Sequence, residues 1–523
     1  MSDRRDKWIS LLAGLGLLAF LAVFALLNFR YLTVFCDGDV YADMELAREI
    51  WRQKTLFPSN WIFGNQYYVI ATPVLAALFY GLTGSLNLAL ALATTAMGLL
   101  LLLSLTWMLS PFVPRRSHRL CALLFFAAAP MGTRLLLEPE GQLFFVLASY
   151  YACYLITLFF VFGDYVRALD APEALRPGAL AVSLALSFAC GMQSLRQTAV
   201  MALPLLALEA LALMGRLIKG GPLLPKSRRN AACRALGYTA ANLLGYGLMR
   251  LLAIPSRTIY AAAPAGLSER LHALWAALRG ICGLDAALFG EAPLFLGCFF
   301  VFQLLCVLAA AGLLFARRKS GLGGLERLWL LCLISLGGTF LAGLALSLRM
   351  REIYLFVWYP LTALSLVLLL ESRLPLRRFA ALLVCLLSVG NLAVSYGSSL
   401  RYARSQDCAP QQAFSRDAVA AGIQYVYGDW SFLPRNAVWS DGGLTVGFWD
   451  DTPFCIRESI NLQDIYGEEE NASALYLAGP WDKWYFLDLA EKTGAELTLF
   501  GDYGDCSAYR SDRQLMHFRS AGD

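Results

Sequence analysis

The chain has 523 residues, of which 58% are hydrophobic and 15% charged, with a formal net charge of +5. Soluble globular chains carry about 25% charged residues, so this composition and a mean hydropathy of +0.56 exclude that class. The basic excess lies mostly in short loops between apolar segments, where it sets membrane orientation, and no nucleic-acid partner is expected. The composition therefore indicates a polytopic membrane protein.

The first apolar run, from about residue 8 to 31, follows Arg4, Arg5 and Lys7. It is too long for a signal-peptide core and lacks a clear cleavage site, which indicates an uncleaved anchor. A helix needs about 20 apolar residues to cross a bilayer. Segments of that kind predict about eleven crossings, near 8–31, 85–110, 119–137, 142–162, 178–195, 198–215, 234–253, 293–316, 327–347, 354–371 and 378–397. The short apolar segment 67–83 is expected to be re-entrant or juxtamembrane.

Basic residues in the alternate loops predict the orientation of these spans, because cytoplasmic loops are enriched in Lys and Arg. The N-terminus then lies inside and, after an odd number of crossings, the tail lies outside. Residues 400–523 hold 10 basic and 19 acidic residues, whereas residues 1–399 hold 33 and 19. We therefore predict a transmembrane domain over 1–399 and a small extracytoplasmic α/β domain over 400–523.

An acidic run, Cys36 to Glu45, lies in the first external loop (31–66), directly after the first span. Carboxylates this close to hydrocarbon are costly and usually serve chemistry or ion handling. From Val40 to Trp51 the spacing predicts an amphipathic helix lying in the interface, with Glu45 and Glu49 off its apolar face. A second such helix is expected after Ser268 as its N-cap.

Three segments together resemble one family. They are the acidic run that begins Asp37-Gly-Asp39, the stretch from Gly191 to Pro204, and the stretch from Arg349 to Pro360. In this order they resemble the membrane glycosyltransferases of the GT-C fold, which include protein mannosyltransferases and lipid A aminoarabinose transferases. The resemblance implies an all-α GT-C-like membrane domain in a bacterial cytoplasmic membrane.

The resemblance also implies a reaction: transfer of a sugar from a polyprenyl-phosphate donor to a glycan, lipid or protein acceptor at the outer face. An acceptor hydroxyl is a poor nucleophile near neutral pH, so a carboxylate must take its proton. Asp39 is the first choice for this general base and Asp37 the second. Two residues apart, they point in different directions and do not form an equivalent pair.

Guanidinium groups suit a departing phosphate because they stay charged and bind it through two hydrogen bonds. Isolated arginines at predicted outer helix ends are candidates, together with a neighbouring tyrosine: Arg196, Arg349, Arg351, Tyr354 and, less strongly, Arg257. Glu138 and Glu140 in the second external loop are candidates to orient the acceptor or to hold Mg or Mn. No His-rich cluster predicts a metal site.

Other interpretations of these residues stay open. Asp39 is also a suitable N-cap, with Asp37 a solvated loop acid, and Glu138 and Glu140 fit a solvated loop. Arginines near span ends also extend toward lipid headgroups. A transporter or flippase of lipid-linked glycans is the alternative function, and a noncatalytic assembly subunit a third; neither needs a general base.

The tail has short β-like runs, at 437–439, 444–449 and 497–500, and possible helices at 413–427 and 484–493. Its tryptophans, among them Trp481 and Trp484, are expected in the core of the small domain, although exposed Trp beside acids also binds sugars. Disulfides are possible among Cys408, Cys455 and Cys506.

Overall fold

A computed structural model of the chain describes most of its residues. The described ranges are 2–64, 66–132, 147–171, 176–219, 225–256, 266–289, 292–317, 321–345, 350–372, 377–449, 455–456, 461–462, 474–515 and 517–518. Glu138, Glu140, Arg257 and Arg349 lie outside these ranges.

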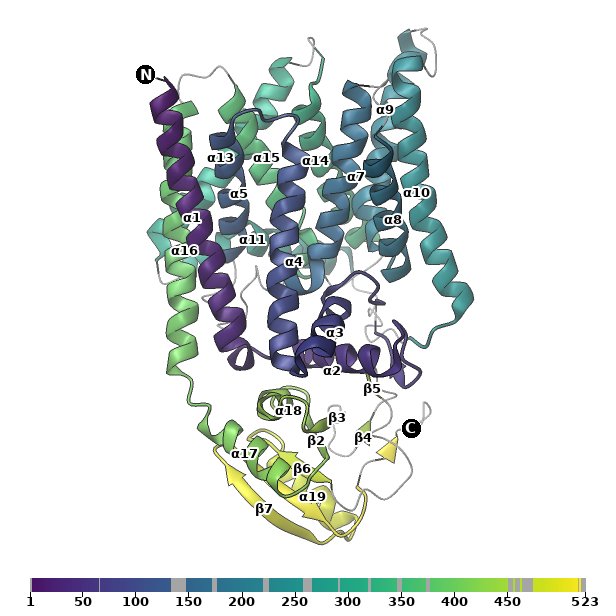
Figure 1. The fold of residues 1–523 in the computed structure, drawn as a ribbon, viewed down its shortest axis with the longest axis vertical. Coiled ribbons are helices and arrows are strands. Elements are labelled where there is room, and N and C mark those ends of the chain that lie inside the picture. Colours follow the sequence, from purple (N-terminus) through teal and green to yellow (C-terminus); the bar gives the residue numbers. More distant parts are fainter. Residues whose placement is uncertain are drawn as a thin grey trace.

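The described residues form a bundle of long helices with a small mixed domain at one end (Figure 1). Eight helical segments are long and apolar enough to cross a membrane, which confirms the predicted fold class. They are Asp6–Val34, Leu86–Leu109, Ala148–Asp170, Thr198–Ile218, Pro293–Arg317, Gly324–Ala345, Glu352–Glu371 and Phe379–Ser405. These segments correspond to α1 (Ser2–Tyr31), α4 (Leu86–Leu109), α7 (Ala152–Asp170), α9 (Leu203–Lys219), α13 (Pro293–Arg317), α14 (Gly324–Ala345), α15 (Trp358–Glu371) and α16 (Arg377–Ser405).

The other three of the eleven expected spans also coincide with helices, but these are shorter or less apolar. They are α5 (Arg116–Ala128), α8 (Pro177–Gln193) and α10 (Lys226–Leu252). Segment 67–83 contains the 12-residue helix α3 (Thr72–Thr83). Two further helices, α11 (Leu267–Cys282) and α12 (Leu284–Phe289), precede α13.

Burial separates central from peripheral helices. Each segment contains an 18-residue apolar window. In Glu352–Glu371, 89% of that window is buried, but in Asp6–Val34 only 22% is buried. A helix that is apolar all round and buried all round belongs inside a bundle. Helix α15 is therefore central, and α1 presents Leu15 and Leu18 outward at a position suited to lipid.

Helix α2 (Gly38–Gln53) crosses the end of the bundle that faces the small domain, while the N-terminus lies at the opposite end (Figure 1). Val40, Met44 and Ala47 are buried, as the predicted apolar face requires. Glu45 and Glu49 are buried as well, at 1% and 2% exposure. They lie off the apolar face, as predicted, and are covered by other segments: the tail contacts Glu45 through Val446, and the first loop contacts Glu49 through Asn60.

The small domain has a five-stranded sheet of order β3-β2-β6-β8-β7. Strand β2 pairs in parallel with β3 and β6, while β8 pairs antiparallel with β6 and β7. The strands are β2 (Tyr425–Asp429), β3 (Thr445–Trp449), β6 (Leu475–Ala478), β7 (Leu497–Tyr503) and β8 (Cys506–Ser511). Helices α17 (Ala409–Ala420), α18 (Leu433–Ala437) and α19 (Lys483–Lys492) belong to this domain, as does the 3-10 turn η6 (Val438–Ser440).

Two short pairings complete the described sheet structure. Strand β1 (Trp61–Ile62) of the first loop pairs antiparallel with β5 (Asn461–Leu462) of the tail. Strand β4 (Cys455–Ile456) pairs in parallel with β9 (His517–Phe518). The β1–β5 pair links two segments that are about 400 residues apart in the chain.

Several local predictions for the tail are correct and others are wrong. Strands β3 and β7 and helix α19 lie where expected. The run 437–439 is helical instead, and the predicted helix 413–427 starts earlier and ends in strand β2. Helix α11 begins at Leu267 with Gly266 as its N-cap, so Ser268 does not cap it. Cys408 and Cys506 are free thiols, and the side chain of Cys455 lies outside the described part.

Candidate active site

The first candidate acid, Asp37, is the N-cap of helix α2. Its Oδ1 accepts a hydrogen bond from the backbone N–H of Val40 at 2.8 Å. A carboxylate at this position satisfies an otherwise unpaired donor and complements the helix dipole. The interpretation in which Asp39 caps the helix is therefore wrong. Asp39 lies in the first turn and its side chain is left for another role.

Asp39 is accessible to water but surrounded by protein. Partial desolvation raises the pKa of its carboxyl, and the nearby positive charge of Arg351 opposes that rise. The Asp39 carboxyl is thus exposed to water and still partly desolvated by the surrounding protein, and we call its surroundings the recess. Arg351 precedes the 3-10 turn η5 (Glu352–Leu355), so these two charges come from segments more than 300 residues apart.

A second acid, Asp43, lies one helical turn after Asp39 on the same side of α2, since residues four apart are neighbours on a helix. Its side chain is buried, with 4% exposure. Burial raises the pKa of Asp43 well above its usual value, and the negative charges of Asp39 and Asp37 raise it further. Burial and the neighbouring negative charges thus both disfavour ionisation of Asp43, whereas Asp39 is exposed to water.

Two tyrosines lie close to this pair of acids. Burial, followed by the charge of Asp43, raises the pKa of Tyr68. Tyr150, in the π-helical turn η3 (Leu147–Tyr151), is within electrostatic range of Asp43. Its hydroxyl is buried and, within the described part of the chain, has no hydrogen-bond partner. The recess thus contains a phenol whose hydroxyl is free to bind a ligand.

Arg196 occupies an aromatic cage beside the acids. Its guanidinium carbon lies 5.1, 5.5 and 5.0 Å from the ring centroids of Tyr151, Tyr154 and Tyr354. These distances are within the range of cation–π attraction. Among the described residues no carboxylate forms an ion pair with Arg196. A half-buried cation without an anionic neighbour is suited to an anionic ligand.

Hydrogen bonds from the neighbouring loops fix this cage. The Tyr154 hydroxyl donates to Gln66 Oε1 at 3.0 Å and lies 3.1 Å from Ser194 Oγ. Gln193 Oε1 accepts from the backbone N–H groups of Val69 and Ile70 at 3.0 and 2.8 Å. The loop before α3 is thereby attached to the end of α8, three residues before Arg196.

The candidate residues from the sequence are thus divided into three groups. Asp39, Arg196, Arg351 and Tyr354 gather around one recess, and the charge of Arg351 acts on both Asp39 and Tyr151. Asp37 is the N-cap of α2 and accepts a hydrogen bond from the backbone N–H of Val40. Arg349, Arg257, Glu138 and Glu140 lie outside the described residues, so their predicted roles stay predictions.

No sequence pattern marked the following residues as candidates for the site: Asp43, Tyr68, Tyr150, Tyr151 and Tyr154. For Asp43 a signal was available, because Asp39 and Asp43 are four residues apart in a predicted helix. The tyrosines lie in segments whose facing partners only the tertiary structure reveals.

In the described ranges no group of three His, Cys, Asp or Glu residues is placed to hold a metal ion. Glu138 and Glu140, the candidates to hold Mg or Mn, lie outside these ranges, so a metal site there stays a prediction.

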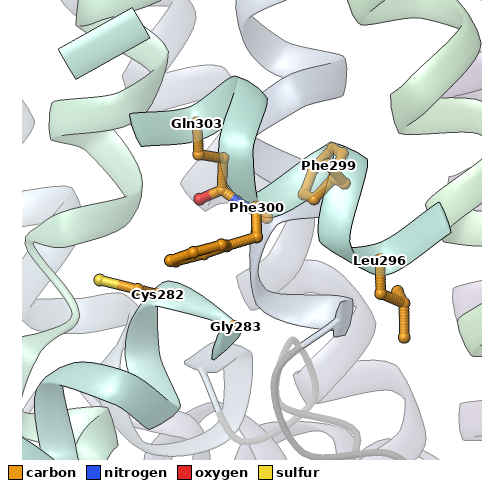
Figure 2. A pocket seen from close by; sticks show the side chains of 7 residues that line it. Cys282, Gly283, Leu296, Phe299, Phe300 and Gln303 are labelled. Carbon is orange, nitrogen blue, oxygen red and sulfur yellow. The ribbon is translucent and has the colours of Figure 1, made fainter. Parts of the chain in front are cut away.

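A separate small pocket lies where the turn between α11 and α12 meets α13 (Figure 2). Its lining is mainly apolar, and its one amide, Gln303, accepts a hydrogen bond from Trp358 Nε1 at 3.2 Å. The other lining residues are Ala129, Cys282, Gly283, Leu296, Phe299 and Phe300. We assign no chemistry to this pocket.

The fold and the recess define a polytopic membrane protein with a charged, tyrosine-rich site where the helical bundle meets its α/β domain. No family model and no curated protein sequence matches the chain. Among solved structures the chain is similar to ArnT from Cupriavidus metallidurans bound to undecaprenyl phosphate, with 13% identity and a TM-score of 0.46. The apo state of the same protein gives 14% and 0.44.

In both comparisons the match covers 98% of this chain and 99% of the other. With TM-scores below 0.5, this match assigns no residue and no substrate, and the functional proposal depends on the residues of the recess.

Proposed function

We propose that the chain is an integral membrane glycosyltransferase that transfers a sugar from a polyprenyl-phosphate donor to an acceptor hydroxyl. The reaction takes place at the extracytoplasmic end of the bundle, in the recess between α2, η3 and η5. The observation that carries the proposal is the position of one hydrated acid, Asp39, beside two arginines and a group of tyrosines. The acceptor is a glycan, a lipid or a protein.

In this reaction Asp39 accepts the proton of the acceptor hydroxyl as its oxygen attacks the anomeric carbon of the sugar. The bond between that carbon and the phosphate oxygen breaks, and the polyprenyl phosphate leaves with the electron pair. The raised pKa of Asp39 makes it a stronger base than an ordinary aspartate, while Arg351 keeps it ionised. Attack opposite to the leaving group inverts the anomeric configuration.

The negative charge that develops on the phosphate needs stabilisation in the transition state. Arg196 meets this need because its guanidinium has no carboxylate partner in the described ranges and is held by three tyrosine rings. Arg351, between Asp39 and the cage, is the second cation. The raised pKa of Asp43 disfavours a second negative charge in a site that must bind a phosphate.

The test compares two isosteric substitutions on the same helix. Asp39→Asn removes the base and should lower sugar transfer by about 100-fold or more. Asp37→Asn keeps an excellent N-cap and should leave most of the activity. Purified variants are assayed with polyprenyl-phosphate sugars, after mass spectrometry of surface glycans from cells with and without the gene has identified the missing sugar.

Normal transfer by Asp39→Asn would exclude this residue as the base. If the wild-type protein moved lipid-linked glycan across the membrane without transferring sugar, the flippase alternative would replace the proposal. Loss of activity in Asp37→Asn, with unchanged folding, would place Asp37 in the chemistry as well.

A further inference from the structure

Two tryptophans of the α/β domain are exposed, although tryptophans in so small a domain are expected to form its core. Trp481 and Trp484 have 84% and 71% of their surface exposed, whereas Trp449 has 2%. The expectation of a core role therefore holds for Trp449 and is wrong for the other two. Tyr485 extends the surface, with its ring centroid 5.5 Å from that of Trp484. We call Trp481, Trp484 and Tyr485 the tryptophan patch.

The backbone that carries the patch is held in place on both sides. Asp482 Oδ1 accepts from the N–H of Gly479 at 2.8 Å, and its Oδ2 accepts from Trp449 Nε1 at 3.3 Å. A Cβ at Gly479 would lie 2.3 Å from the Phe432 ring, so the turn is closely packed. An exposed aromatic surface on a fixed turn loses little conformational entropy when it binds a partner.

The patch lies on the side of the sheet that faces away from the membrane part. Successive side chains of a strand point to opposite faces. Val426, Leu475 and Leu477 belong to the core that continues into the bundle. Tyr427 and Tyr476 instead form a second core with Phe486 of α19. Helix α19 therefore covers the outer face of the sheet, and a role of its tryptophans as anchors in the lipid interface is excluded.

Charged residues accompany the patch in the chain: Asp482 and Lys483 lie between the two tryptophans, and Asp488 and Lys492 lie further along α19. Lys483 donates to Ser507 Oγ at 2.5 Å, and Lys492 pairs with Asp488 at 2.7 Å. A stable protein interface needs about 800 Å² per partner around an apolar centre. Two indoles and a phenol between charged residues offer much less apolar surface than that. A sugar ring matches this pattern, because its C–H face stacks on an indole while its hydroxyls reach neighbouring charges.

We propose that the tryptophan patch binds an extracellular glycan chain, with one pyranose ring on each indole. This site is distinct from the recess at α2 and goes beyond the proposed transfer reaction. Its ligand class is a chain of hexoses whose linkages leave the C–H faces accessible.

The test measures binding to the full-length protein in nanodiscs by isothermal titration with cellotetraose, chitotetraose and β-mannotetraose. At least one of these probes should bind, and Trp481→Ala and Trp484→Ala should each weaken its binding about tenfold. Leu499→Ala is the matched control, because Leu499 is an exposed apolar residue of the same domain, with 52% exposure. This control should bind as the wild type does.

Failure of all three probes to bind overturns the proposal, and so does equal weakening by Leu499→Ala. A dimer that the tryptophan substitutions dissociate would also overturn it, because the patch would then be a protein interface. Asp39→Asn should bind the glycan normally. Failure of the transfer reaction and failure of glycan binding are therefore distinguishable.

Discussion

The reactivity of Asp39 depends on two opposing effects at a single carboxyl group. Desolvation raises its pKa, and the charge of Arg351 lowers it. Near neutral pH a general base must be ionised yet retain affinity for a proton, so both effects are needed. The proposed function therefore gives Arg351 two roles: its charge favours the ionised form of Asp39, and its guanidinium binds phosphate.

Substitution of Arg351 should change the pH dependence of transfer as well as its rate. In Arg351→Ala the pKa of Asp39 rises, because the effect that lowers it is lost, and more of the base is protonated at a given pH. The acidic limb of the pH–rate profile should move to higher pH, and the plateau should fall about 100-fold. Arg351→Lys keeps the charge and should restore the position of the limb. An unmoved limb in Arg351→Ala would show that the two residues are not coupled.

Sequence patterns identified the charged residues of the site better than its uncharged ones. Asp39, Arg196 and Arg351 stand out because isolated charges near a membrane are costly. Tyr151 and Tyr154 do not, since a tyrosine in an apolar segment is equally suited to the core or to an interface. Their role depends on which helix faces them, and a single sequence does not contain that information.

At the scale of elements, helix α2 connects the proposed site to the tail. The Tyr41 hydroxyl donates to the Leu444 carbonyl at 3.3 Å, and Arg48 donates to the Gly442 carbonyl at 3.3 Å. Glu45 Oε1 accepts from the N–H of Val446 at 3.5 Å, while its buried Oε2 has no partner in the described part of the chain. One side of α2 thus presents Asp39 and Asp43 to the recess, and another contacts the α/β domain.

Glu45 should make this contact dependent on pH. Burial raises its pKa from 4.5 to about 7, Arg48 and the Val446 N–H oppose the rise, and Glu49 adds to it. The folded state then binds the proton more tightly than the unfolded state. Stability should therefore fall as pH rises from about 4.5 to 7, by roughly 3 kcal/mol at most.

Melting temperatures of the purified protein at pH 5 and pH 8 test this effect. Glu45→Gln should show a smaller decrease in melting temperature between pH 5 and pH 8 than the wild type, and should melt above it at pH 8. Glu49→Gln is the control: Glu49 pairs with Arg52 at 2.7 Å, so its loss should destabilise the protein at both values. If the wild type showed no decrease in melting temperature between pH 5 and 8, this role of Glu45 would be ruled out.

The prediction of α2 as an amphipathic helix was correct about its apolar face, but it did not include the contacts of its other face. Periodicity identifies the face that is buried, but it does not show what covers the opposite face. Here the tail does so, through residues about 400 positions later in the chain. The acids at 45 and 49 have the spacing of solvated residues and are nevertheless buried.

At the scale of the whole molecule, hydropathy predicts the positions of the long helices better than it predicts any local feature. Apolar segments of the right length are visible in the sequence, and each expected span coincides with a helix, although three of these helices are shorter or less apolar than a typical span. The described fold also separates the basic N-terminus from the acidic tail, at opposite ends of the bundle (Figure 1). Packing of the helices around α15 was not predictable, since nearly all of them have similar apolar composition.

The proposed function requires the recess to lie on the extracytoplasmic side of the membrane. The orientation of the bundle decides whether it does. Helix α9 starts near Arg196 and runs for 17 residues, about 25 Å, to Lys219. Lys219 thus lies at the far end of α9 from the recess. The basic residues near it in the chain, Arg216, Lys219, Lys226, Arg228 and Arg229, predict that this end of the bundle is cytoplasmic. Alkaline phosphatase requires disulfides and is active only outside the cytoplasm. A fusion at the C-terminus should therefore be active and a fusion after Lys219 inactive. The reverse pattern would place Asp39 on the cytoplasmic side, where an extracytoplasmic acceptor does not reach it, and would overturn the proposed function.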